Sequence, residues 1–193
     1  MTKGFDVDSN PLDALVAGCK AVYMCAGYEK QEPETIDFMV NAGLAVMNAA
    51  SKNAAVAQTC VVLTSSTGST NPPGAPSDAI KNETDFLSDP EVQRSNKRFS
   101  PAAKTLMEIA AFDFVGRDRQ NRVVQPDKNR SDRIRLCIMN PSLILGPQLQ
   151  PGPVSGNGLP WFSRIAKGET MNDQVWSLAQ LFVLDFYSLV ASV

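Results

Sequence analysis

The sequence predicts an α/β fold with a doubly wound parallel sheet, because short apolar runs alternate along the chain with segments of helical periodicity. Three runs, at residues 21–26, 60–64 and 135–139, have the length and the β-branched content of buried strands. Helical segments between them give the βαβ order of neighbouring parallel strands. We therefore expect these three strands to pair side by side and to be buried on both faces.

The expected crossover helix between the first two strands opens at Pro33-Glu34, where a proline and acidic residues suit a helix start. Its small and apolar positions recur at helical spacing: Ile36, Val40, Gly43, Met47 and Ala50. A second helix is expected to begin near Ser100, and its expected apolar face consists of Ala103, Leu106, Ala110 and Phe114.

A short helix is expected to precede the first strand. It is indicated by Asn10 as N-cap, by Pro11 at the first helical position and by a stop at Gly18. Its entry strand would be the stub formed by residues 5–7.

Composition excludes several classes of function. A net charge of −2 over 193 residues gives no electrostatic footprint for nucleic acid or for an anionic membrane. Histidine is absent, which excludes Ser-His-Asp and Cys-His nucleophiles and His-ligated metal sites. The four cysteines show no C-x-x-C spacing, and the N-terminus has no hydrophobic signal core. We therefore expect a reduced, soluble, cytoplasmic protein.

Four stretches, in order along the chain, resemble motifs of the extended short-chain dehydrogenase/reductases. Residues 12–26 are similar to the family's helix ending "GCD" followed by a strand ending "VFHxA". VVLTSS at 61–66 matches "VVxTSS", KTLME at 104–108 matches "SKTLAE", and NPSLILGP at 140–147 matches "NPxLVLGP". The resemblance runs from about Asp6 to Asp185 and points to the dihydroflavonol and cinnamoyl-CoA reductases of this NAD(P)-dependent family.

The resemblance implies a partial Rossmann-like NAD(P)-binding domain at residues 1–170 and the start of a truncated substrate-binding lobe at 171–193. The family's first strands and its Gly-x-x-Gly-x-x-Gly turn, which binds the cofactor pyrophosphate, have no counterpart before Asp6. The apolar tail from Val175 onward suggests an incomplete lobe. NAD and NADP both stay open as cofactors, because the residue that selects between them follows the family's second strand.

Three residues stand at the family's catalytic positions, and two of them match the family's residue type. Ser66 matches the hydroxyl that hydrogen-bonds the substrate carbonyl. Lys104 matches the lysine of Tyr-x-x-x-Lys, which binds the nicotinamide ribose and lowers the pKa of the tyrosine. The tyrosine position is Ser100 here, and a serine hydroxyl is a far weaker acid than a phenol of pKa roughly 10. The structural alternatives are a turn cap for Ser66, a solvated lysine for Lys104 and a helix N-cap followed by Pro101 for Ser100.

The same resemblance assigns residues to the cofactor site. An acidic and an aliphatic residue would contact the adenine, small residues would let the backbone approach the adenosine, and a Pro-Ser-Leu segment would lie beside the nicotinamide. The residues assigned are Asp6, Val7, Ala26, Gly27, Thr64, Lys104, Pro141, Ser142 and Leu143.

The resemblance thus implies an NAD(P)H-dependent oxidoreductase acting on a small-molecule carbonyl or alcohol. One alternative is a catalytically impaired pseudo-enzyme fragment, which Ser100 and the missing glycine-rich turn favour. Another is a nucleotide-sugar epimerase or dehydratase or a 3β-hydroxysteroid dehydrogenase, which use the same parts. Substrate and oligomeric state stay open.

Overall fold

The computed structural model describes residues 11–27, 32–53, 56–70, 88–118, 122–128 and 133–141. The chain divides into two compact units, Met1–Asn140 and Pro141–Val193, and Pro141 alone is described in the second. The predicted boundary after residue 170, the stub at residues 5–7 and the apolar tail lie outside the described residues.

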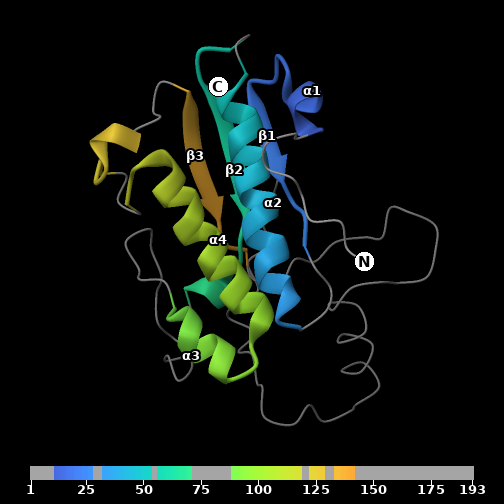
Figure 1. Cartoon of the computed structure of the whole chain (residues 1–193), viewed down its shortest axis with the longest axis vertical. Coiled ribbons are helices and arrows are strands. Elements are labelled where there is room, and N and C mark those ends of the chain that lie inside the picture. The colour runs from blue at the N-terminus through green and yellow to red at the C-terminus, as the bar shows by residue number, and fades with distance from the viewer. Residues whose placement is uncertain are drawn as a thin grey trace, which may run out of the picture. The chain divides into compact units, whose positions relative to one another are not determined.

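The described sheet has three parallel strands, β1 (Ala21–Met24), β2 (Thr59–Thr64) and β3 (Ile134–Met139), in the spatial order β1-β2-β3 (Figure 1). Val61 in the centre pairs with Val22 on one side and with Leu136 on the other. The predicted strands and their parallel pairing are confirmed. Because the strands are parallel, all three carboxyl ends lie at the same edge of the sheet.

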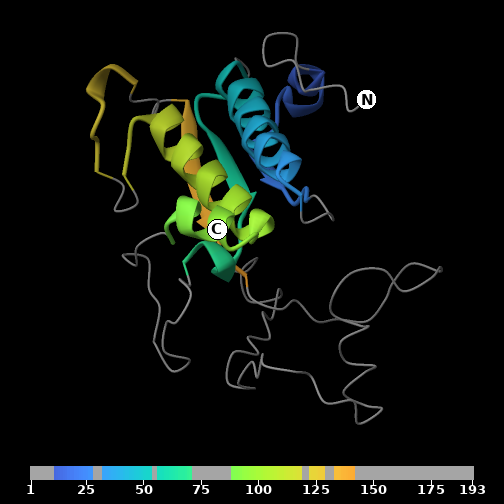
Figure 2. The same cartoon turned by 60° about the horizontal axis from the view of Figure 1, so that its bottom comes forward.

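Two helices, α2 (Glu34–Ser51) and α4 (Phe99–Val115), lie side by side against one face of this sheet (Figures 1 and 2). Pro33 takes the N-cap position of α2, as the sequence predicted for the start of this helix to within one residue. Strand and helix side chains meet in one buried core, which includes Met24, Met39, Met47, Val61, Leu63, Ala103 and Met107. The α/β fold class is confirmed.

Gly43 of α2 packs closely against α4. Of the described glycines, it has the least space for an added Cβ atom. A Cβ atom on Gly43 would lie 2.9 Å from Cγ of Met107 and 3.5 Å from its Sδ. Both residues are buried, so an added side chain has no direct route to solvent. The glycine therefore sets the separation of the two helices.

The expectation that all three strands are buried on both faces is wrong for β1 and β3. Met24 points into the core and is 6% exposed, whereas Tyr23, its neighbour along β1, is 67% exposed. Cys137 of β3 is exposed on the same side as Tyr23. Side chains alternate across a strand, and α2 and α4 cover one of the two faces in the described part of the chain. β2 is the strand that meets the expectation most closely.

The apolar face predicted for α4 is rotated from the observed one. Ala103 is fully buried, but Leu106, Ala110 and Phe114 are only partly buried. The buried residues of α4 are Ala102, Ala103, Thr105, Met107, Glu108, Ala111 and Val115. The prediction failed because it placed polar residues outward, whereas two of these buried side chains are polar and have buried partners.

The start of α4 also differs from the prediction for Ser100. Arg98 holds the N-cap position and Phe99 is the first helical residue, so Ser100 lies inside the first turn and is not the cap. Pro101 is tolerated there, because backbone N–H groups of the first turn have no partner within the helix.

The short helix α1 (Leu12–Val16) ends as predicted, since Gly18 adopts a positive φ of 77°. Asn10, the predicted cap, lies outside the described residues, and Pro11 occupies the N-cap position. Buried Asn53 joins this end of α1 to the rest of the fold. Its Oδ1 accepts from Gly18 N at 3.1 Å, and its Nδ2 donates to the carbonyl oxygen of Val16 at 3.0 Å.

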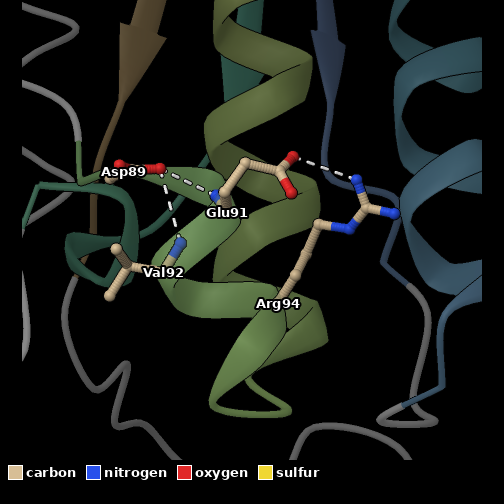
Figure 3. A network of polar contacts seen from close by, with 4 residues as sticks. All are labelled: Asp89, Glu91, Val92 and Arg94. Carbon is tan, nitrogen blue, oxygen red and sulfur yellow. Dashed lines mark hydrogen bonds and ion pairs between the residues drawn. The ribbon is translucent and has the colours of Figure 1, made fainter.

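One helix, α3 (Pro90–Ser95), was not predicted from the sequence. Asp89 caps it, because Oδ1 accepts from the backbone N–H groups of Glu91 (2.8 Å) and Val92 (3.4 Å), and Arg94 bridges Glu91 at 3.0 Å (Figure 3). The signal was present in Asp-Pro-Glu, an N-cap followed by proline and an acidic residue. Two 3₁₀ turns, η1 (Thr67–Ser69) and η2 (Pro126–Lys128), complete the described elements.

Within the described ranges, no helix combines the length and the apolar character needed to cross a membrane.

We predict that Gly43→Leu destabilises the fold by about 1–3 kcal/mol, because the new side chain would overlap Met107 in a packed core. Urea unfolding followed by circular dichroism measures the change. Asn41→Leu, at an exposed position of the same helix, is the matched control and should change stability by less than about 0.5 kcal/mol. Equal effects of the two substitutions would contradict the close approach of α2 and α4.

Candidate functional site

The carboxyl ends of the strands bring several predicted site residues to one edge of the sheet. Ala26 and Gly27 follow β1, Thr64 ends β2, and Ser66 follows it. Pro141, two residues after β3 along the chain, belongs to the second unit. In open parallel sheets ligands bind outside this edge. The edge is therefore the candidate site.

Lys104 reaches this edge from α4. Its Nζ donates to the carbonyl oxygen of Thr64 at 2.7 Å, and its side chain is half-buried. Burial lowers the pKa of Lys104, while the nearby Cys25 and Glu108 act in the opposite direction. Cys25 lies beside the same strand end, with its Sγ 3.6 Å from Oγ1 of Thr64. The lysine is thus anchored between α4 and β2 instead of being fully solvated.

Ser66 caps a turn, as its structural alternative predicts, and its hydroxyl can also serve the role predicted from the resemblance. Its Oγ accepts from the backbone N–H of Gly68 at 3.1 Å, so it caps η1 as a turn serine does. That bond uses the oxygen as an acceptor. The hydroxyl proton is a separate donor, which could serve a substrate oxygen.

Ser100 lies one turn before Lys104 on α4, and the two positions share a helical face. It is partly buried. The structure places a hydroxyl at this position, where the resembling family has a phenol.

A polar cluster, which we call the Glu108 cluster, consists of the buried residues Glu108, Ser65 and Ser69 and of the partly buried Asn140. Oε1 of Glu108 accepts from Ser65 Oγ, from Ser69 Oγ at 2.5 Å and from Asn140 Nδ2 at 2.8 Å. Asn140 Nδ2 also lies 3.1 Å from the carbonyl oxygen of Ser66. The Glu108 side chain is fully buried. One carboxylate thus links α4 to the segments that follow β2 and β3.

A second buried link connects α3 to the same turn. Gln93 Nε2 donates to the carbonyl oxygen of Gly68 at 2.9 Å, and its Oε1 accepts from Thr105 Oγ1 at 3.1 Å. Gln93 and Thr105 are both fully buried. The turn after β2 is therefore held on two sides by polar groups from helices.

Sequence reasoning missed the Glu108 cluster. In the sequence, Glu108 only completes the KTLME motif and Asn140 only begins the NPSLILGP motif. A signal exists in hindsight: Glu108 stands one turn after Lys104 among residues that are otherwise mostly apolar or small.

Several assigned cofactor residues cannot be placed. Asp6, Val7, Ser142 and Leu143 lie outside the described residues. Ala26 and Gly27 are exposed, and a Cβ on Gly27 would meet nothing within 4 Å, which leaves open space for an approaching ligand. The fit for a dinucleotide thus rests on Lys104, Thr64, and the open backbone after β1. In the described ranges, no group of three or more His, Cys, Asp or Glu residues could hold a metal ion.

A shallow depression of about 220 Å³ lies apart from this site. Phe112, Ile134 and Leu136 contribute to its lining, and Ile134 is the first residue of β3. The depression is therefore near the amino end of the sheet, opposite the edge that carries Lys104.

We predict that the burial of Lys104 makes stability depend on pH. Because the folded-state pKa is lowered below the 10.5 of an exposed lysine, unfolding takes up a proton between these two values. The free energy of unfolding should therefore rise with pH through that window. Urea unfolding from neutral pH to about pH 10.5 should show this rise in the wild type and its loss in Lys104→Met.

Lys52→Met, which removes an exposed lysine, is the matched control for loss of one positive charge. Parallel stability profiles for the wild type and Lys104→Met would contradict the burial of this group.

Comparison with known proteins finds similar sequences and structures. No family model matches the chain. Cinnamoyl-CoA reductase CAD2 from Medicago truncatula is 29% identical over 152 residues, which are 75% of this chain and 41% of the relative. The chain therefore spans less than half the length of this curated relative.

Two solved structures match parts of the chain. Yeast methylglyoxal/isovaleraldehyde reductase Gre2, complexed with NADPH, matches with a TM-score of 0.54 and 23% identity, covering 75% of this chain and 44% of that one. Vestitone reductase from alfalfa (Medicago sativa L.) matches with a TM-score of 0.44 and 26% identity over 62% of this chain and 36% of that one.

The likeness to Gre2 confirms the Rossmann-like fold, and the alignment with the cinnamoyl-CoA reductase supports the motif resemblance over most of the chain. The chain is thus similar in sequence to a cinnamoyl-CoA reductase over 152 residues and similar in fold to Gre2.

Proposed function

We propose that the protein is an NADPH-dependent oxidoreductase that reduces the carbonyl group of a small molecule. The observation that carries this proposal is the position of Lys104, anchored on the Thr64 carbonyl at the carboxyl edge of a parallel sheet. We propose NADPH as the cofactor instead of NADH because the structure of the yeast reductase Gre2 contains NADPH. The bound cofactor would supply the hydride to the carbonyl carbon.

Lys104 would hold the cofactor. An ammonium group has three donors, and Lys104 directs one of them to Thr64 O. The other two can bind a pair of vicinal hydroxyls, such as those of a ribose, placed over the end of β2. Partial burial strengthens such bonds, because the local dielectric is lower than in water.

Ser66 would orient the substrate. Its oxygen accepts from Gly68 N, which fixes the side chain, and its proton can be donated to a carbonyl oxygen. A hydrogen bond to that oxygen stabilises the negative charge that develops as hydride arrives at carbon.

Ser100 occupies the position of the family's proton donor and would be the candidate for that role. Its weak acidity supports a second candidate function. A serine hydroxyl is a weak acid, so protonation of the developing alkoxide would be slow or would depend on water. The second candidate is accordingly a protein that binds the dinucleotide but turns over substrate poorly or not at all.

A cytoplasmic location belongs to the same proposal. It is supported by the four cysteines, none of which is disulfide-bonded.

The test is NADPH binding by the full chain, measured by cofactor fluorescence, followed by NADPH oxidation with a panel of aldehydes and ketones. Lys104→Ala should weaken NADPH binding by about tenfold or more, because it removes a charge-assisted hydrogen bond. Lys52→Ala, an exposed lysine, is the control and should leave binding unchanged.

Three outcomes separate the possibilities. Turnover that falls in Ser66→Ala supports the reductase. Binding without turnover supports the impaired protein. A wild type that does not bind NADPH, or a Lys104→Ala variant that binds it as well as the wild type does, would overturn the proposed site.

A further inference from the structure

The Glu108 carboxylate has an unusual position for a charged group. It is fully buried, and three donors from two different segments converge on one of its oxygens. These donors replace part of the hydration that this oxygen loses on burial.

The segments joined by this carboxylate are those that carry the candidate site. Ser65 and Ser69 flank the turn that contains Ser66, and Asn140 follows β3. Asn140 also reaches the carbonyl oxygen of Ser66 at 3.1 Å. A shift of Glu108 would therefore move the turn and the end of β3 relative to α4.

Glu108 also acts on Lys104 from the same helix. The two residues are four positions apart, so they stand on one helical face. Cys25, after β1, and Glu108 are the titratable groups found to favour the charged form of this lysine, against the effect of burial. Glu108 is thus connected to two of the residues to which the proposed function assigns a role, Ser66 and Lys104.

We propose that Glu108, one helical turn after Lys104, is a positioning residue that fixes the Ser66 turn and the end of β3 against α4. The importance of Glu108 for catalysis rests on the proposed function. Its hold on the Ser66 turn can be tested without cofactor or substrate.

The experiment is acetylation of the full chain with a water-soluble N-hydroxysuccinimide ester over a range of pH, with Lys104 labelling followed by mass spectrometry. Only the neutral amine reacts, so the midpoint of labelling reports the protonation of Lys104. Glu108→Gln keeps the size and an acceptor oxygen but removes the charge. The midpoint should move to lower pH by about half a unit or more, because the ammonium loses a stabilising charge.

Glu91→Gln is the matched control, since Glu91 is an exposed glutamate on α3. It should leave the Lys104 midpoint in place. A Lys104 midpoint that is the same in Glu108→Gln as in the wild type, with the fold intact by circular dichroism, would overturn the proposal.

Ser69→Ala tests the positioning part separately and keeps the carboxylate. It removes the hydroxyl that joins the turn to Glu108, so amide hydrogen exchange at Ser69 and Thr70 should become at least several-fold faster. Exchange at wild-type rates would show that Glu108 does not hold the turn. This variant keeps the proposal falsifiable even if Glu108→Gln fails to fold.

The two proposals fail in different ways. If the wild type does not bind NADPH but the labelling midpoint shifts in Glu108→Gln, the proposed function is wrong and the influence of Glu108 on Lys104 stands. If NADPH binds through Lys104 but neither the midpoint nor the exchange rates change, the proposed function stands and Glu108 is not a positioning residue.

Discussion

The described fold depends on the hydrogen bonds made by one buried carboxyl group, that of Glu108. Removing a carboxylate from water costs several kcal/mol unless donors replace the lost hydration. Glu108 obtains them from Ser65, Ser69 and Asn140, which come from segments distant in sequence. These donors converge only when β2 and β3 are paired and α4 lies across them. The polar cluster therefore favours one arrangement of the edge over alternatives that apolar packing alone would allow.

The same constraint explains the orientation of α4. Turned to bury its most apolar stripe, the helix would expose Thr105 and Glu108 and bring Leu106 and Phe114 fully inward. The observed orientation leaves those two apolar residues partly buried. It buries the polar pair with partners, and it lets Lys104 reach the carbonyl oxygen of Thr64. Apolar contact at Gly43 and Met107 then sets how closely α2 packs beside it.

Local sequence patterns predicted the elements that are set by a few adjacent residues. The strand runs, the start of α2 at Pro33 and the stop at Gly18 each depend on a few adjacent residues, so they could be predicted without tertiary information. The buried face of α4 and the open face of β1 and β3 depend on partners far away in sequence. Ser66 and Lys104 were assigned through family motifs, whereas the link from Glu108 to Asn140 joins residues 32 apart and left no periodic signal.

A double-mutant cycle between Glu108 and Asn140 tests the central claim most directly, with the free energy of unfolding in urea measured for the wild type, Glu108→Met, Asn140→Ala and the double variant. The partly buried hydrogen bond at 2.8 Å predicts a coupling energy of about 1 kcal/mol or more between the two sites. Effects that add to within about 0.3 kcal/mol would contradict the claim that this carboxylate joins α4 to the end of β3.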